Sequence, residues 1–461
     1  MQSTPSGHSP NQAAMSQLPG PKLPFLFYVV FLALFMPVFF DIGSLHMSAS
    51  RLVLLFLTPI MFLQLFSGRA GKVQPTDVMI LLFMIWFAIS IFVNNRSAFV
   101  TFVGSNMLIL FGGYLAGRVY VRGPRAFRQM VFLYGGLVLF TLPFALYESR
   151  TSVMWIARMI DQLPMVSSSQ DVDYPQRHGL YRVQVIFTHP IHYGLFNTVC
   201  FAYVMVGLRD QLKSSARWMW AGVILLCCFL SVSSGPLLGI IAQIALIMYA
   251  QMTRGVKIRW KVLMGTLATL YVLLDILSSR PAYYAIIERL AFNSGTAYVR
   301  KILLEYGTAQ IARTPVFGVG YNTWDLPAYM TGSLDNYWLM TALVYGLPAL
   351  VFLAGAYLYT LIKAGRVDLE GDREQTNMRL GWSISTVGTM LSLATVAVWS
   401  EMASLIFLTL GCGVWLLEAK ARRTGEESTL PDTPPERRNQ FTRFPQHAGV
   451  GGPAFSRSPA S

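Results

Sequence analysis

Long apolar runs separated by short polar segments dominate the chain. A helix needs roughly 20 apolar residues to cross a bilayer, so we predict twelve membrane-spanning helices. The first run is longer than the roughly 7–15 apolar residues of a signal peptide, and we interpret it as a retained span. The predicted spans lie near residues 23–40, 51–66, 77–93, 99–117, 128–147, 189–208, 217–231, 234–252, 260–277, 336–362, 380–397 and 401–418.

Two polar stretches, at about 148–188 and 278–335, are much longer than the other connections between predicted spans. Long loops in an otherwise economical topology usually serve a function. Each contains apolar residues at helical spacing, so we expect a short amphipathic helix in each loop, over residues 152–163 and 297–312. The predicted apolar faces consist of Val153, Ile156, Ala157 and Ile160, and of Val299, Ile302, Leu303 and Tyr306.

The two ends of the chain differ from the middle. The tail over 419–461 is rich in Pro, Arg, Ser and Gly, and it contains few apolar residues. Such a segment buries too little apolar surface to order itself. We therefore predict disordered ends at 1–22 and 419–461, with one transmembrane domain over 23–418 between them.

Composition supports this interpretation. Apolar and aromatic residues make up 54% of the chain and charged residues only 13%, which excludes an ordinary soluble protein. All four cysteines lie inside apolar runs, so no disulfide framework is expected. The predicted fold class is all-α: a polytopic transmembrane helical bundle with two long loops.

The net charge of +14 matters less than its distribution. Of the 36 Lys and Arg residues, 25 fall in the segments that share a side with the N-terminus, and the short loops of the opposite side contain almost none. Basic residues concentrate in cytoplasmic loops. We therefore predict that both termini are cytoplasmic and both long loops lie on the other face. The bilayer, rather than nucleic acid, is the expected surrounding of this basic protein.

The long loops and the adjoining helix ends are rich in arginine. The planar guanidinium binds phosphate or carboxylate oxygens in pairs, so this bias predicts an anionic ligand. The alternative is that these arginines contact lipid headgroups, which suits Arg182 and Arg300 least because they lie within dense polar and aromatic segments. The group comprises Arg150, Arg158, Arg177, Arg182, Arg280, Arg289, Arg300 and Arg313, with Lys301 as the single lysine.

Two histidines stand at the start of the predicted sixth span. His189 and His192 are three residues apart and would share a helix face, where either could accept a proton from a hydroxyl group. The alternatives are an N-terminal cap for His189 and an interhelical hydrogen bond for His192. No third ligand stands at a recognisable spacing, so we predict no metal site. Asp171 and Asp173 form an Asp-x-Asp pair that we interpret as a solvated turn.

The second long loop contains the strongest local pattern. Pro315 ends its predicted helix, and Gly318 and Gly320 allow a tight backbone path that could approach a ligand. Asp335 and Asn336 then precede the tenth predicted span. A carboxylate is favoured there as a cap and by the helix dipole.

This pattern resembles the O-antigen ligase and O-antigen polymerase superfamily, and more particularly its exopolysaccharide polymerases. The specific motifs cover about 50 residues, with a looser match over 182–194. The matching features are an arginine-bearing helix at Arg300, Pro-x-Phe-Gly-x-Gly from Pro315 to Gly320, x-Asn-x-x-Leu from Asn336 to Leu339, and Tyr345-Gly346.

The resemblance implies a glycosyltransferase in the bacterial inner membrane. Such enzymes act on the periplasmic face, where they transfer a glycan from a polyprenyl-diphosphate carrier to a hydroxyl acceptor without a metal or other cofactor. Ligases have a histidine before the motif asparagine, whereas this chain has Asp335, which favours a polymerase. Chain-length regulators and export proteins are the implied partners. We predict Asp335, His189 and His192 as the catalytic residues, and Arg182, Arg300, Arg280, Arg313, Asn336 and Tyr321 as the substrate-binding residues.

Two other functions fit the same topology. A flippase for lipid-linked glycans would also span the membrane many times, and a ligase would transfer the glycan to a different acceptor. Transporters generally show paired halves and polar residues near the midplane. We find no internal repeat, and Asn106, Asn197 and Asp275, which lie inside predicted spans, are the main evidence left for transport. Interhelical hydrogen bonds would account for them.

Overall fold

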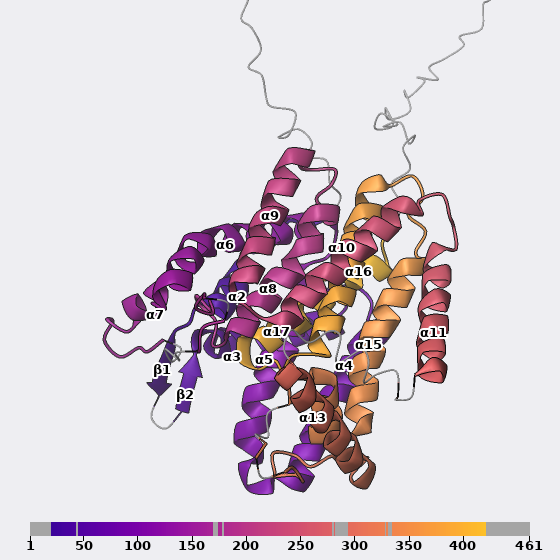
Figure 1. Cartoon of the computed structure of the whole chain (residues 1–461). Helices are drawn as coiled ribbons and strands as arrows, with labels where there is room; N and C mark the ends of the chain where they lie inside the picture. Colours follow the sequence, from indigo (N-terminus) through magenta and orange to yellow (C-terminus); the bar gives the residue numbers. More distant parts are fainter. Residues whose placement is uncertain are drawn as a thin grey trace, which may run out of the picture. The chain divides into compact units, whose positions relative to one another are not determined.

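The computed structural model is an all-α helical membrane protein (Figure 1). It describes residues 20–42, 45–168, 174–177, 179–278, 281, 294–327, 329–330 and 334–420. The helices are α2 (Phe25–Phe35), α3 (Ala49–Phe66), α4 (Pro75–Asn94), η1 (Arg96–Ala98), α5 (Phe99–Tyr120), α6 (Pro124–Thr151), α7 (Trp155–Ile160), α8 (Pro190–Ala202), η2 (Tyr203–Gly207), α9 (Ser214–Leu230), α10 (Ser234–Met252), α11 (Arg259–Leu277), α13 (Ser294–Arg313), α14 (Tyr337–Tyr345), α15 (Leu347–Arg366), α16 (Arg373–Leu393), α17 (Ser400–Gly411) and η3 (Val414–Leu417).

The apolar runs fold into helices as predicted. In the described part of the chain, each of the twelve predicted spans overlaps a helix. Eight helices there are long and apolar enough to cross a membrane, and α2 and α9 are shorter apolar helices. A multi-pass membrane protein is therefore confirmed, whereas the number of twelve spans stays a prediction.

The predicted tenth span is not one continuous helix. α14 ends at Tyr345, and α15 begins at Leu347. Gly346 between them has φ 86°, a left-handed conformation that favours glycine. A Cβ at this position would also collide with the carbonyl group of Val316. The prediction of a single helix over 336–362 is wrong because this close approach breaks the span.

A β-hairpin stands where the first span was predicted to end. α2 stops at Phe35, just before Pro37, which cannot donate a backbone hydrogen bond. β1 (Phe39–Ile42) and β2 (Leu45–Ser48) then pair antiparallel. Phe39 also exchanges backbone hydrogen bonds with Ser167 of the first long loop, both at 2.8 Å. The first long loop is therefore hydrogen-bonded to the strand that follows α2.

Both helices predicted in the long loops are present, as α7 and α13. The apolar face predicted for α13 is only partly correct. Leu303 and Ile302 are buried, whereas Val299 and Tyr306 are exposed. The buried side of α13 instead includes Ile311, which packs in one cluster with Leu303 and residues of α14.

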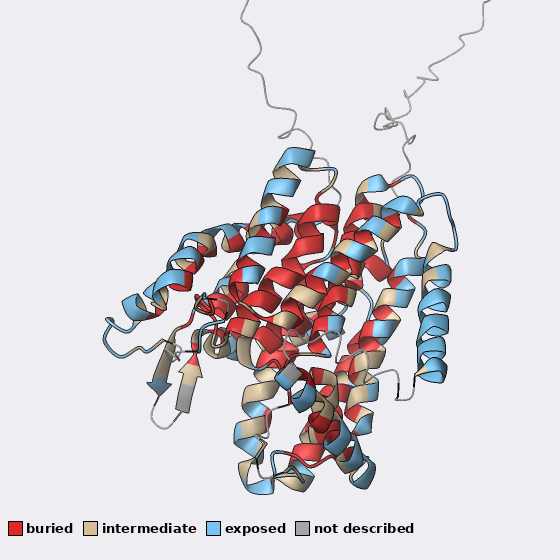
Figure 2. Ribbon diagram, viewed as in Figure 1, coloured by how far each residue is buried: buried red, intermediate tan, exposed pale blue. Residues whose placement is uncertain are grey.

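Burial divides the helices into inner and outer ones (Figure 2). The helical segment Ser400–Leu417 is 83% buried, and α17 packs against α5. α11 has no buried residue along its length and appears pale blue in Figure 2. An apolar helix with this exposure is stable in lipid but not in water.

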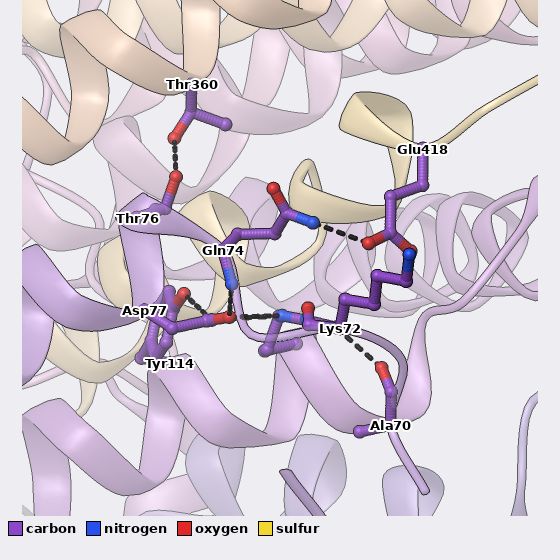
Figure 3. Close-up of polar contacts among 9 residues, drawn as sticks. Ala70, Lys72, Gln74, Thr76, Asp77, Tyr114, Thr360 and Glu418 are labelled. Carbon is purple, nitrogen blue, oxygen red and sulfur yellow. Dashed lines mark hydrogen bonds and ion pairs between the residues drawn. The ribbon is translucent and has the colours of Figure 1, made fainter. Parts of the chain in front are cut away.

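A buried polar cluster joins α4 to α5 (Figure 3). The Asp77 carboxylate accepts hydrogen bonds from the Tyr114 hydroxyl and from Nε of Arg118, the latter at 3.0 Å. The Arg118 guanidinium also donates to the carbonyl groups of Ala70, at 2.8 Å, and Lys72, at 2.7 Å. The charges are therefore paired and hydrogen-bonded, as burial requires.

The first and last described residues lie at the same end of the bundle. Gly20 and Lys420 line one cavity of about 460 Å³ together with Arg118 and Arg122. The two ends of the described chain therefore lie close together.

Candidate functional site

Arg182 lies in the segment that leads into α8. Its side chain is 9% exposed, and Nη2 donates to Oγ of Ser233, the N-cap of α10, at 3.2 Å. The guanidinium carbon lies 5.4 Å from the ring centroid of Tyr174, a cation–π distance. Burial lowers the pKa of Arg182 to about 10, with a smaller contribution from the nearby charge of Arg177. The group still carries its charge at neutral pH.

Arg300 comes from α13, in the other long loop. Its Nη2 donates to the carbonyl oxygen of Thr395, between α16 and α17, at 3.0 Å. Burial lowers the pKa of this arginine, and the charge of Asp335 opposes the shift. Two elements far apart in sequence thus each supply one partly buried guanidinium.

These two guanidinium groups keep unused hydrogen-bonding capacity. Nε of Arg182 and Nε of Arg300 are buried and have no hydrogen-bond partner among the described residues. Within the same residues, no carboxylate lies within 4.0 Å of either group. Buried charge without a close counter-ion is costly. The arrangement is therefore suited to an anion with several oxygen acceptors.

Asp335 belongs to the same cluster. Burial raises the pKa of its carboxyl group, while the positive charges of Arg300, Arg182 and Arg177 act in the opposite direction. The alternative interpretation of Asp335, as only the cap of the next helix, is wrong. Asn336 is the N-cap of α14, and its Oδ1 accepts the backbone N–H groups of Trp338 and Leu339. The Asp335 carboxyl group is therefore not the cap, and it lies near enough to the arginines for their charges to act on its pKa.

Arg177 was one of the loop arginines but was not predicted as a site residue. Its Nη1 donates to the carbonyl oxygen of Val232 at 3.3 Å, next to Ser233. Its charge influences the pKa of Arg182, Arg300 and Asp335. The arginine bias of the loop pointed to this residue, but no spacing distinguished it from its neighbours.

Unusual backbone conformations gather around these residues. Val185 and Val232 have φ of 52° and 43°, and Ser400 has φ of 49°. Positive φ is a genuine outlier for a β-branched residue and costs on the order of 1–3 kcal/mol. Val185 follows Arg182 by three residues, and Val232 precedes its hydrogen-bond partner Ser233. Strain of this kind concentrates at functional sites.

Glu148, near the end of α6, holds this strained segment in place. Its buried carboxylate accepts the backbone N–H of Gln184 at 2.7 Å and that of Val185 at 2.9 Å. This residue was not predicted as part of the site, and it stands at the edge of a predicted span. A single carboxylate beside an apolar run gave no signal of its role.

His189 caps α8, as one of the two interpretations predicted. Its Nδ1 accepts the backbone N–H of Ile191 at 3.0 Å. The neutral ring therefore carries its proton on Nε2 and has no free lone pair, which argues against His189 as a base.

His192 is buried beneath Trp399. Its ring centroid lies 4.1 Å from that of Trp399, and its Nδ1 lies 3.4 Å from the hydroxyl oxygen of Thr188. Thr188 belongs to the segment that leads into the same helix, so this contact is not the predicted interhelical hydrogen bond. Trp399 was also not predicted, although its ring contacts both His192 and His189.

Two other predicted site residues, Arg313 and Tyr321, make other contacts, and a third falls outside the described residues. Arg313 pairs with Asp325, with both side chains exposed, and lies roughly 20 Å along the α13 axis from Arg300. The Tyr321 hydroxyl lies 3.0 Å from that of Tyr345. Arg280, like Asp171 and Asp173, falls outside the described residues.

The glycine motif has a packing role in the structure. Val319 and Gly320 donate their backbone N–H groups to the carbonyl oxygens of Leu343 and Val344, both at 2.9 Å. Gly318 has φ 65°, and a Cβ there would lie 2.5 Å from the Leu343 oxygen. The expected close approach is therefore to the C-terminal end of α14, where the Tyr345-Gly346 motif lies.

The chain matches no protein-family model and no curated protein. The resemblance to the O-antigen superfamily therefore stays a prediction. The described residues contain no group of three or more His, Cys, Asp or Glu side chains that could hold a metal ion.

Proposed function

We propose that the protein is a polysaccharide polymerase. It would join oligosaccharide units linked to polyprenyl diphosphate at the periplasmic face of the bacterial inner membrane, in exopolysaccharide or O-antigen synthesis. The observation that carries the proposal is the convergence of Arg182 and Arg300, both partly buried, on a cluster where neither has a close carboxylate partner among the described residues. A diphosphate supplies the negative charge and the acceptor oxygens that these groups require.

Arg182, Arg300 and Asp335 suit the chemical steps of glycosyl transfer. The oxygen of an acceptor hydroxyl bonds to the anomeric carbon of the donor glycan, and the bond from that carbon to the diphosphate oxygen breaks. The diphosphate leaves with its charge facing Arg182 and Arg300, which stabilise it. The hydroxyl proton passes to Asp335, whose carboxylate becomes a stronger base because burial raises its pKa.

The contacts among the loops at this cluster support the proposal that these loops lie on one side of the membrane. Arg177 and Arg182 contact the connection between α9 and α10, and Arg300 contacts the connection between α16 and α17. Charge distribution assigns both connections, like the two long loops, to the non-cytoplasmic side. Residues predicted as cytoplasmic meet each other instead, as in the hydrogen bond from Asn377 to Asp210. We propose twelve spans and a periplasmic site on this basis.

Two polar residues inside predicted spans, Asn106 and Asn197, give no support for a transporter. Nδ2 of Asn106 donates to the carbonyl oxygen of Phe102 at 2.8 Å, and Nδ2 of Asn197 donates to that of Tyr193 at 2.8 Å. Both bonds stay within one helix, so the expected interhelical bonds are not what these amide groups make. Short-range bonds of this kind do not define a path across the membrane.

The products distinguish the three candidate functions. Purified protein in lipid nanodiscs, supplied with one polyprenyl-diphosphate-linked repeat unit, should yield lipid-linked glycans of two or more units. Glycan transferred to a lipid without diphosphate would indicate a ligase. Movement of the donor across the bilayer of sealed vesicles that contain the protein, without any new glycosidic bond, would indicate a flippase and would contradict the proposal.

A further inference from the structure

A second feature lies beside the arginine cluster. An apolar groove of about 420 Å³ opens between α13, α14 and α15. Its lining includes Leu304 and Ile311 of α13, Leu339 of α14 and Leu350 of α15, and none of the described residues that line it is charged. A diphosphate therefore has no partner in this groove, whereas a hydrocarbon chain does.

The groove continues the arginine site along α13. Arg300, Leu304, Thr308 and Ile311 are separated by four, four and three residues, which places them on one face of the helix. The distance from the first to the last is roughly 16 Å along the axis. One stripe of α13 thus has a cation at one end and groove-lining residues over the next three turns.

Two other segments make the same connection. Asn336 lines the groove and directly follows Asp335. Ala394 also lines it, and the next residue, Thr395, accepts the hydrogen bond from Arg300. The groove therefore begins where the charged cluster ends. Its other wall includes Leu350 of α15, a helix long and apolar enough to cross a membrane.

We infer that this groove binds the part of the carrier's polyprenyl chain nearest the diphosphate. The inference rests on the proposed function and adds the position of the lipid to it. A ligand with a doubly charged head and a long apolar chain needs a cationic site that opens directly onto an apolar channel. The contiguous stripe from Arg300 to Ile311 provides this arrangement, and α15 leads the chain toward the bilayer.

Thr308→Trp tests the inference by filling the groove. The Thr308 side chain is exposed, and its hydroxyl donates to the Leu304 carbonyl of its own helix at 2.7 Å, so the change removes no bond between helices. Ala309→Trp is the matched control, because Ala309 is exposed on α13 but does not line the groove. Both variants are assayed as full chains with two donors that carry the same glycan diphosphate, one on a long polyprenyl chain and one on a ten-carbon prenyl chain.

We expect Thr308→Trp to raise the KM for the long-chain donor at least tenfold and to leave the KM for the short-chain donor within a factor of two. Ala309→Trp should change neither value. An equal rise for both donors, or no rise for either, would contradict the groove assignment and leave the polymerase proposal standing. Failure of the wild-type chain to use any donor would instead contradict the proposed function.

A second variant separates blockage of the groove from misfolding. Thr308→Cys is folded first and then modified with a bulky maleimide, and the four native cysteines are buried. Modification should reproduce the selective loss of the long-chain donor. Unchanged donor selectivity after complete modification would overturn the inference.

Discussion

Oε2 of Glu148 accepts the backbone N–H of Val185 at 2.9 Å, although Val185 has a positive φ of 52°. The other carboxylate oxygen accepts the N–H of Gln184. Two charge-assisted hydrogen bonds therefore stabilise a conformation that a valine rarely adopts. This carboxylate therefore fixes the backbone two and three residues after Arg182.

Glu148→Gln should weaken this support. The amide has one oxygen and an NH₂ group, so one backbone N–H faces another donor and loses its partner. We expect a loss of about 1–3 kcal/mol in the free energy of unfolding, the usual cost of a buried unsatisfied group. Thermal unfolding of the detergent-solubilised protein measures this loss. A melting temperature and a transfer rate equal to those of wild type would show that the carboxylate does not hold the segment.

The Asp77–Arg118 pair should matter for stability and not directly for chemistry. Both side chains are at most 5% exposed, and Asp77→Asn leaves a buried guanidinium without its counter-charge. Breaking a buried pair in this way costs about 3–5 kcal/mol. Glu418→Gln is the control, since its contact with Gln74 is exposed and should contribute less than about 0.5 kcal/mol. Equal melting temperatures for the two variants would contradict a structural role for the pair.

Asp335→Asn should raise the stability of the protein at neutral pH while it lowers the transfer rate. Burial raises the pKa of Asp335 above its unfolded value, so folding favours the protonated form and the free energy of unfolding falls as pH rises through the folded-state pKa. The asparagine variant escapes this penalty. It should melt at a higher temperature than wild type at neutral pH, and the difference should disappear below about pH 3.9, the ordinary value for aspartate.

Activity should change in the opposite direction. The transfer rate of wild type should fall as pH drops through the raised pKa of Asp335, and Asp335→Asn should lower it by about 10²–10⁴-fold, the usual contribution of a general base. Asp325→Asn, at an exposed carboxylate paired with Arg313, is the matched control and should keep full activity. Near-normal transfer by Asp335→Asn would assign the base to another residue, with His192 as the remaining candidate.

The proposed sidedness can be tested with single cysteines at exposed positions. Gln176 lies in the first long loop, and Glu370 lies between α15 and α16. The four native cysteines are buried, so background labelling should be low. An impermeant thiol reagent added from the periplasmic side should label Gln176→Cys and not Glu370→Cys. The reverse pattern would invert the topology and place the arginine cluster in the cytoplasm.

The helices followed from sequence because apolar length is a local property. The break at Gly346 did not, since it depends on the approach of Val316 from another segment. The hairpin at Phe39 likewise depends on its contact with Ser167. Hydropathy does not report such pairings between distant segments.

The site was predictable only in part, for the same reason. Arginine bias identified Arg182 and Arg300, which the fold brings into one cluster. It also suggested Arg313, which pairs with Asp325 instead. Glu148 and Trp399 act through contacts across the fold, so no local pattern marked them. The sequence left open whether Asp335 only caps the next helix, because Asp335 and Asn336 are both favourable caps and only the geometry distinguishes them.

The central claim is that Arg182 and Arg300 bind the diphosphate of a lipid-linked glycan donor. The most direct measurement is the affinity of the full-length protein in nanodiscs for polyprenyl diphosphate, compared among wild type, Arg182→Lys, Arg300→Lys and the control Arg313→Lys. Lysine keeps the charge but loses the paired geometry of the guanidinium. A charge-assisted contact contributes about 1.5–3 kcal/mol, so each of the first two variants should bind roughly 10–100-fold more weakly, and Arg313→Lys should bind like wild type. Equal affinity for all four proteins would contradict the account.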